Sequence, residues 1–407
     1  MRILVVIETD LVEKGPHQTH HVMERLSLRG HEVRVMDFEI QWRDRPRRSM
    51  RSKRISLQNF SKAVRDARIT IIRPNILYVP LLDHLSELFS YSKEVYRQLN
   101  EFRPDVVIGF SILNTYLALR LAKRDKIPFV YYLIDAQYTL VPFKLLRPIA
   151  KMVESQIARH ADRVIVINEE LRKYAINLGA KPERVSVIRA GIDSLRFNPS
   201  IDGCRVREKY GISKDDIVLF FMGWLYTFSG LREVAHSLLE AKDKHPNIKL
   251  LVVGKGDIYE ELEELREKQG LNQLVLVNWQ PYEKIPQYIG ASDVCLLPAY
   301  NNEVMRNIVP IKMYEYMACG KPVISTRLPG IMREFGYNNG VLYVDQPTEV
   351  LEKVTELIDD GSFRDYGIKA REFVEKYSWE MITDDFEDIL KDMVRSSREK
   401  AQNYEQN

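Results

Sequence analysis

Along the chain, short runs of apolar residues alternate with longer segments whose apolar positions recur at helical spacing. The short runs predict strands, and the longer segments, such as 18–29 and 115–123, predict amphipathic helices. Strands that alternate with helices are typical of parallel α/β sheets. In the first half of the chain, the predicted strands are 2–7, 32–38, 76–79, 105–110, 129–134, 163–167 and 185–188.

A second series of strands follows with the same alternation. The segment from Arg189 to Asp193, with Pro199 soon after it, separates the two series and predicts a linker. We therefore expect an N-terminal domain at 1–192, a C-terminal domain at 193–378, and helices at 379–407 that cross back to the N-terminal domain. The predicted strands of the second series are 217–222, 249–253, 274–278, 294–297, 322–325 and 341–344.

The predicted fold class is α/β, with two Rossmann-like, doubly wound domains that face a central cleft. In open sheets of this kind, ligands bind at the carboxyl ends of the strands, where the strand order reverses. Two such domains can also close around a substrate by a hinge motion. The pattern therefore predicts a ligand site lined by the carboxyl ends of both sheets.

Length and composition agree with this organisation. A chain of 407 residues is long enough for two domains, and its net charge of +3 gives no general reason to expect nucleic acid. The three cysteines lack the spacing of a metal site. The longest apolar run, 217–226, is about half as long as a membrane span. Because Glu8 and Asp10 end the first apolar run, we expect no signal peptide and a cytoplasmic protein.

Several segments, in the right order, resemble the retaining glycosyltransferases of family four, which have the GT-B architecture and belong to the glycosyl transferases group 1. The strongest is 310–324, which reads Pro-Ile-Lys-Met-Tyr-Glu-Tyr-Met-Ala-Cys-Gly-Lys-Pro-Val-Ile. The resemblance runs over nearly the whole chain and is weak between residues 40 and 100. The other matching segments are 21–33, 188–199, 221–231, 251–257 and 291–298.

The resemblance implies a hexosyltransferase that moves a sugar from a nucleotide diphosphate sugar, such as a UDP-sugar, to an acceptor with retention. It implies no metal ion and no organic cofactor. Two other interpretations stay open: a nucleotide-sugar epimerase of the same architecture, and a catalytically silent protein that binds sugar nucleotides. An NAD enzyme is a weaker alternative, because no glycine-rich fingerprint follows the first strand.

The resemblance assigns the sugar donor mainly to the C-terminal domain. Glu315 matches the residue that binds the ribose hydroxyls, although a solvated helix face or an i,i+3 ion pair with Lys312 would also explain it. Lys312 opposes the dipole of its own helix, and a phosphate there would offset the repulsion, so we assign it a catalytic role. The other donor-binding candidates are Gly15, Gly223, Ser229, Gly230, Lys255, Gly256 and Asn307.

Departures from the family pattern concern the diphosphate. Trp224 and Ser229 stand where the commonest pattern has an arginine and a lysine, and Asn307 stands where it often has a second glutamate. Gly230 lets backbone N–H groups approach an anion, or it only turns the chain. Charge on the leaving diphosphate must then be met by helix N-termini or by other cations, namely Lys312, Lys255 or Arg306.

In the N-terminal domain, Asp135 follows the strand 129–134, where many family members have a histidine. Its carboxylate can take the proton of an acceptor hydroxyl, or it can cap the next turn. Gly15 can admit a phosphate before the helix that starts near residue 19. His17 is assigned to the acceptor side, and we expect no metal site there, because the adjacent His20 and His21 face different directions on a helix.

The segment 43–54 holds seven basic residues and one acid. It suits anionic lipid headgroups, and the apolar and basic segment 138–147 can lie in the same interface. A disordered loop or nucleic-acid binding by charge would explain the charge too, but no nucleic-acid-binding signature is present. We therefore expect a peripheral protein at the cytoplasmic face of a membrane, with a glycan or lipid-linked acceptor. The residues assigned to this surface are Arg47, Arg48, Arg51 and Arg54.

Overall fold

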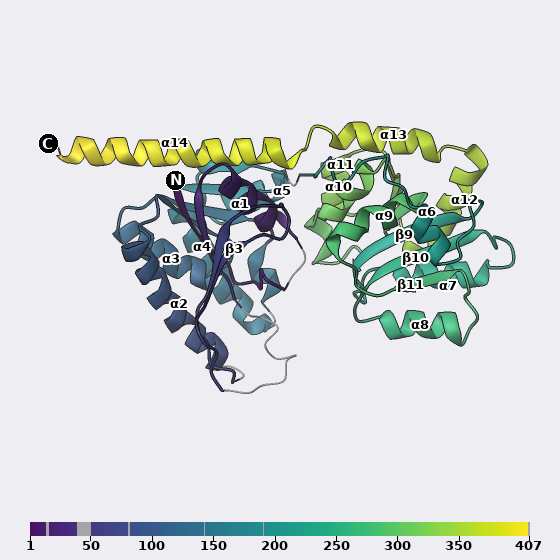
Figure 1. Ribbon diagram of the computed structural model, residues 1–407, viewed down its shortest axis with the longest axis horizontal. Coiled ribbons are helices and arrows are strands. Elements are labelled where there is room, and N and C mark those ends of the chain that lie inside the picture. Colours follow the sequence, from purple (N-terminus) through teal and green to yellow (C-terminus); the bar gives the residue numbers. More distant parts are fainter. Residues whose placement is uncertain (14–15, 39–49, 80–81, 142, 190, 406–407) are drawn as a thin grey trace. The chain divides into compact units, whose positions relative to one another are not determined.

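The computed structural model describes residues 1–13, 16–38, 50–79, 82–141, 143–189 and 191–405. The chain divides into two units (Figure 1). Unit 1 contains Met1–Ala190 together with Trp379–Asn407, and unit 2 contains Gly191–Ser378. Both ends of the sequence therefore belong to unit 1, whereas unit 2 is one continuous segment.

Unit 1 is built on a sheet in the order β3-β4-β2-β1-β5-β6-β7-β8. All neighbouring strands are parallel except β3 and β4, which are antiparallel. The order reverses at β1, which lies between β2 and β5. The strands are β1 Arg2–Val6, β2 Glu32–Met36, β3 Ile55–Phe60, β4 Ile69–Arg73, β5 Val106–Gly109, β6 Phe129–Leu133, β7 Arg163–Val166 and β8 Val185–Val187.

One predicted strand of unit 1 is wrong. The segment 76–79 contributes only an isolated bridge between Arg51 and Leu77, and the strand of this region is β4, which ends directly before Pro74. Proline has no N–H to donate, so it stops a ladder. The hairpin of β3 and β4 was not predicted, because five of the six residues of β3 are exposed and give no apolar alternation.

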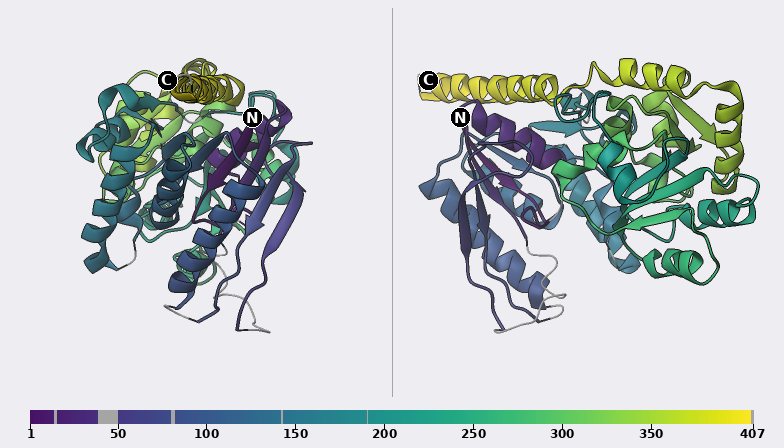
Figure 2. Two further views of the ribbon diagram at one scale, coloured as in Figure 1. Left: turned by 90° about the vertical axis from the view of Figure 1, so that its left-hand side faces the viewer. Right: turned by 45° about the vertical axis from the view of Figure 1, so that its right-hand side comes forward.

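Helices cover both faces of this sheet (Figure 2). On one face, Leu4 and Val6 of β1 share a core cluster with Tyr91 of α2, Leu119 of α3 and Ile157 of α4. The other face carries α1 and α14. The helices of unit 1 are α1 Gln18–Leu28, α2 Leu82–Glu101, α3 Leu113–Arg124, α4 Arg147–His160, α5 Glu169–Asn177 and α14 Trp379–Glu405, with short 3-10 turns η2 Gln137–Leu140, η3 Lys144–Leu146 and η4 Pro182–Arg184.

The last helix, α14, is tied to α1 by packing and by charge. Trp379 is buried and its ring stacks on His21, with centroids 4.4 Å apart. Arg25 Nε lies 2.7 Å from Glu380 Oε1, and Arg29 Nη1 lies 2.9 Å from an oxygen of Glu387. The start of the chain and its last helix therefore complete one structural unit.

Unit 2 has a parallel sheet in the order β11-β10-β9-β12-β13-β14, which reverses at β9. All six strands lie where the second apolar series predicts them, within two residues at each end. They are β9 Ile217–Trp224, β10 Ile248–Lys255, β11 Leu274–Val277, β12 Val294–Leu297, β13 Val323–Thr326 and β14 Val341–Val344. The helices are α6 Cys204–Lys209, α7 Leu231–Glu240, α8 Tyr259–Glu267, α9 Ile285–Gly290, α10 Ile311–Ala318, α11 Pro329–Phe335, α12 Val350–Asp360 and α13 Phe363–Val374, with η5 Tyr282–Lys284, η6 Met305–Asn307 and η7 Pro347–Glu349.

Candidate functional site

Two glycines lie at the carboxyl ends of the central strands of the unit 2 sheet, at the point where the strand order reverses. Gly223, in β9, has φ +128°, and Gly254, in the neighbouring β10, has φ +154°. A Cβ on Gly254 would come 1.9 Å from the carbonyl oxygen of Gly223, so a larger residue does not fit. The edge is therefore bare backbone at the place where open α/β sheets bind their ligands.

Lys312 brings a positive charge to this edge. It lies in the first turn of α10, and its Nζ donates a hydrogen bond to the carbonyl oxygen of Met222 at 2.7 Å. The ammonium is also 4.4 Å from the ring centroid of Phe221. Burial lowers the pKa of Lys312 to about 8, against the opposing charge of Glu315. Since an ammonium has three N–H donors, Lys312 keeps donors for a ligand.

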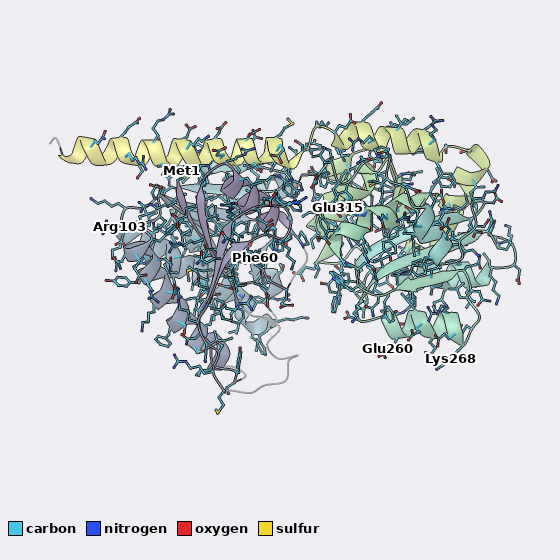
Figure 3. The ribbon with its side chains drawn as sticks, in the orientation of Figure 1. Met1, Phe60, Arg103, Glu260, Lys268 and Glu315 are labelled. Carbon is cyan, nitrogen blue, oxygen red and sulfur yellow. The ribbon has the colours of Figure 1, made fainter. Side chains whose placement is uncertain are left out.

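Glu315 lies one turn further along α10, where Figure 3 labels it. It is only 5% exposed, and its Oε1 accepts a hydrogen bond from the Tyr282 hydroxyl at 2.6 Å. Burial raises its pKa to about 7, although Tyr282, Lys312 and Arg196 act in the other direction. This carboxyl is therefore not on a solvated helix face, and within the described residues no ion pair joins it to Lys312. Tyr282 was not among the predicted site residues, because it comes from the separate turn η5 and has no motif of its own.

Gly230 and Ser229 form the approach to helix α7. Gly230 has φ +73°, and a Cβ there would meet the Pro298 carbonyl oxygen at 1.9 Å, so packing alone requires glycine at this position. The hydroxyl of Ser229 is buried and has no hydrogen-bond partner among the described residues. A donor near a helix N-terminus that is left without a partner suits an anionic ligand.

The loops after β9 and β10 carry the remaining donor candidates. Lys255 is exposed at the end of β10, and Gly256, with φ +155°, passes so close that a Cβ would lie 2.4 Å from the Leu225 nitrogen. Trp224 is 48% exposed, and its Nε1 donates to Asp257 at 3.3 Å. The side chain of Asn307 and the whole of Gly15 lie outside the described residues.

In unit 1, Asp135 lies just beyond the carboxyl end of β6. Burial raises the pKa of its carboxyl to about 7, and within the described residues it has no hydrogen-bond partner. The segment after it is held by Glu154 of α4, which accepts hydrogen bonds from the backbone nitrogens of Gln137 at 3.2 Å and Tyr138 at 3.4 Å. The sequence did not reveal Glu154, because it comes from a different element.

The histidines at the start of α1 have structural partners. The backbone nitrogen of His17 donates to Nδ1 of His20 at 3.2 Å, and Nε2 of His20 donates to the Leu11 carbonyl at 2.8 Å. Burial lowers the pKa of His20 to about 4, so its ring is neutral. In the part of the chain that the structure describes, no group of histidine, cysteine and acidic side chains could hold a metal ion.

Half of the predicted membrane-facing arginines can be described. Arg47 and Arg48 lie outside the described residues, and Arg51 is exposed. Arg54, the residue before β3, makes two hydrogen bonds of 2.8 Å to the buried Glu94 of α2, so it ties the start of that strand to the helix instead of projecting as a free surface cation. Among the described residues, no helix is both long and apolar enough to span a bilayer.

Family models match both halves of the chain. The Glycosyl transferase 4-like domain matches residues 16–191, and Glycosyl transferases group 1 matches residues 205–372. An uncharacterized glycosyltransferase of Methanocaldococcus jannaschii is 22% identical over 79% of this chain and 81% of its own length. A D-inositol 3-phosphate glycosyltransferase of Corynebacterium jeikeium is 28% identical over 56% of this chain and 57% of its own length. The chain thus spans little more than half of some of the relatives it matches.

Solved structures share the fold. Sucrose-phosphate synthase of Thermosynechococcus elongatus superposes with a TM-score of 0.76 at 18% identity, covering 97% of this chain and 100% of that one. HepE of Anabaena, solved with UDP, has a TM-score of 0.72 at 16% identity, covering 96% and 100%. These likenesses confirm the expected fold class, two α/β domains with parallel-sheet cores as in GT-B structures.

Proposed function

Because this chain belongs to the group 1 glycosyltransferases of GT-B architecture, we propose that it transfers a sugar from a nucleotide diphosphate sugar to an acceptor, with retention of configuration. The observation that carries the proposal is that one helix, α10, holds both the buried cation Lys312 and the buried carboxyl Glu315, with Lys312 on the bare edge of β9. A UDP-sugar is the first donor to test, since HepE of Anabaena was solved with UDP and with UDP-glucose. The proposal includes no metal ion and no organic cofactor.

In unit 2, Glu315 accepts hydrogen bonds from the ribose hydroxyls, and Lys312 binds the diphosphate. Ser229 supplies a hydroxyl and α7 its N-terminal dipole, in place of the cations that the commonest family pattern has at 224 and 229. As the bond to the sugar breaks, negative charge grows on the leaving diphosphate. Lys312 then stabilises the transition state more than the bound donor.

On the acceptor side, Asp135 receives the proton of the attacking hydroxyl. Its pKa of about 7 suits this role, because a general base works best when its pKa lies near the operating pH. Glu154 is a positioning residue, since it fixes the backbone directly after Asp135. We place the acceptor, a glycan or a lipid-linked sugar, at the cytoplasmic face of a membrane.

Donor binding is tested by replacing Glu315 with glutamine. Glu315→Gln is expected to weaken UDP binding in calorimetry by about 1–3 kcal/mol, the scale of a hydrogen bond to a charged group. The matched control is Glu334→Gln, since Glu334 also accepts a tyrosine hydroxyl, that of Tyr314 at 2.6 Å, in the same unit. Equal UDP affinity in the two variants would contradict the assignment of Glu315.

Transfer itself is tested with a panel of UDP-sugars, with and without added acceptors. A transferase releases UDP and forms product only when an acceptor is present. Conversion of the nucleotide sugar without any acceptor would favour an epimerase. Binding of UDP-sugar without turnover under any condition would favour a silent sugar-nucleotide-binding protein.

A further inference from the structure

Large apolar side chains project into solvent along one short stretch of unit 1. Five of them lie between Phe143 and Met152, and they are 60, 92, 49, 56 and 60% exposed in chain order: Phe143, Leu145, Leu146, Ile149 and Met152. Exposed apolar residues are common one at a time, but clusters of them mark an interaction surface. We name this cluster the α4 face.

The helix that carries part of the α4 face is anchored to the unit 1 core. Ile149 and Met152 are three positions apart in α4, a spacing that puts them on one side of that helix. Leu145 lies in η3, directly before α4. On the opposite side of α4, Ile157 and Ala158 are buried in the unit 1 core. The buried side of α4 therefore packs on the unit 1 core, while its opposite side exposes Ile149 and Met152.

Charge on the α4 face has one sign. Residues 143–153 contain Lys144, Arg147 and Lys151 and no acid. Lys144 and Lys151 are exposed, and neither has an ion pair among the described residues. The same side of α4 continues to Gln156 and His160, which line a cavity of about 350 Å³ with three cations of α3: Arg120, Lys123 and Arg124. Lys123 and Arg124 are paired with acids, but Arg120 has no ion pair within the described chain.

Large apolar groups interleaved with exposed lysines suit one occupant best; Lys144 and Lys151 have no acidic partner among the described residues, and Lys151 lies 5.2 Å from the Tyr138 ring centroid. Protein interfaces are depleted of lysine, whereas the surface of an anionic bilayer takes apolar side chains at the acyl boundary and lysines at the phosphates. We propose that the α4 face docks on anionic lipid. This inference deepens the proposed function, because it says which surface brings a lipid-linked acceptor to Asp135, and it assigns the main contact to α4 instead of to 43–54.

The test is sedimentation of the full chain with phosphatidylcholine vesicles that contain or lack phosphatidylglycerol, without any sugar nucleotide. The triple variant Leu145→Ser, Ile149→Ser and Met152→Ser removes the apolar stripe. The matched control is Phe89→Ser, Leu195→Ser and Ile368→Ser, whose side chains are 79, 92 and 49% exposed elsewhere. We expect the stripe variant to lose at least about tenfold in partition to anionic vesicles, and the control to bind like the parent protein.

Charge is tested separately with Lys144→Ser and Lys151→Ser. Each is expected to reduce partition to anionic vesicles by about fivefold, and added salt should have the same effect. An unchanged stripe variant, an equal loss in the control, or equal binding to neutral vesicles would overturn the proposal. So would a parent protein that is a dimer in light scattering and becomes a monomer in the stripe variant while vesicle binding persists, since the occupant would then be a second copy.

The outcome can be told apart from that of the donor site. UDP raises the melting temperature by binding unit 2, and this shift is expected to be the same in the stripe variant and in the parent protein. Vesicle binding without any rise in melting temperature on addition of UDP would contradict the proposed donor site but would still support the α4 face as the lipid-binding surface. A rise in melting temperature with UDP but no vesicle binding would support the donor site and contradict the proposal for the α4 face.

Discussion

At the scale of single residues, each unit contains candidate ionisable groups whose burial favours their neutral forms. Burial raises the pKa of Glu315 and Asp135 to about 7 and lowers that of Lys312 to about 8. Each of these groups gives up hydration that it would keep in the unfolded chain. We therefore expect these groups to reduce the stability of the unit that contains them when it is empty, and a bound ligand to restore that stability.

Stability against pH measures this effect at Glu315. Its folded pKa is raised from 4.5 to about 7, so its contribution to stability is complete below the unfolded value and is lost as pH rises through 7. Glu315→Gln should therefore stabilise unit 2 by about 1–3 kcal/mol near pH 8 and by much less near pH 4. Urea unfolding at both pH values checks this. A variant that is destabilised at pH 8 would contradict it.

Lys312 should affect turnover more than donor binding. Lys312→Met is expected to lower kcat by about 10²–10³, the scale for removing one donor that stabilises a developing anion, with a smaller change in UDP affinity. Lys321→Met is the control, because the Lys321 ammonium also rests on a main-chain carbonyl, that of Gly290 at 3.2 Å.

The pH profile distinguishes the charge of Lys312 from a structural role. With a pKa of about 8, the parent enzyme should lose activity as pH rises through 8, because the cation is lost. Lys312→Arg keeps its charge at any accessible pH, so it should shift that loss to higher pH. A profile that is the same in both proteins would show that this ammonium does not act in catalysis.

At the scale of elements, the apolar pattern predicted the strands and helices that are buried, because burial requires apolar side chains at regular spacing. The strands of unit 2 were found because each is a buried apolar run. The β3–β4 hairpin was missed because its edge strand is exposed, and the partner of Arg54 was missed because Glu94 is contributed by a distant helix. Tyr282 contacts Glu315 in unit 2, and Glu154 holds the segment after Asp135 in unit 1, and both come from elements that have no motif of their own. Spacing along the chain does not encode such tertiary contacts.

The contribution of helix α14 to the stability of unit 1 can be measured directly. Trp379→Ala removes a buried ring that stacks on His21, and we expect it to destabilise unit 1 by about 3–5 kcal/mol. UDP affinity should be unchanged, since the donor residues lie in unit 2. Trp279→Ala is the control, because Trp279 is 55% exposed. Denaturant unfolding followed by circular dichroism gives the comparison, and equal losses would contradict the role of α14.

At the scale of the whole molecule, the two units differ in how the chain builds them. Unit 2 is a continuous segment with its own parallel sheet and core cluster, whereas unit 1 needs both ends of the sequence. We expect a fragment of residues 191–378 to fold alone and to bind UDP, and a fragment of residues 1–190 to be unstable. Calorimetry and chemical unfolding of both fragments test this, and a stable 1–190 fragment would show that α14 is dispensable.

Because α14 is the last helix of the sequence and belongs to unit 1, it also sets the order in which the two units can complete their folding during translation. Domains fold during synthesis, which proceeds at about 5–20 residues per second. Translation of the segment 191–378 therefore takes roughly ten to forty seconds, and it falls between the syntheses of the two parts of unit 1. During that interval Tyr132 lacks its neighbour Phe386, and His21 lacks Trp379. The second unit to be translated is thus the first that can be completed, and the nascent first unit is the natural client for a chaperone.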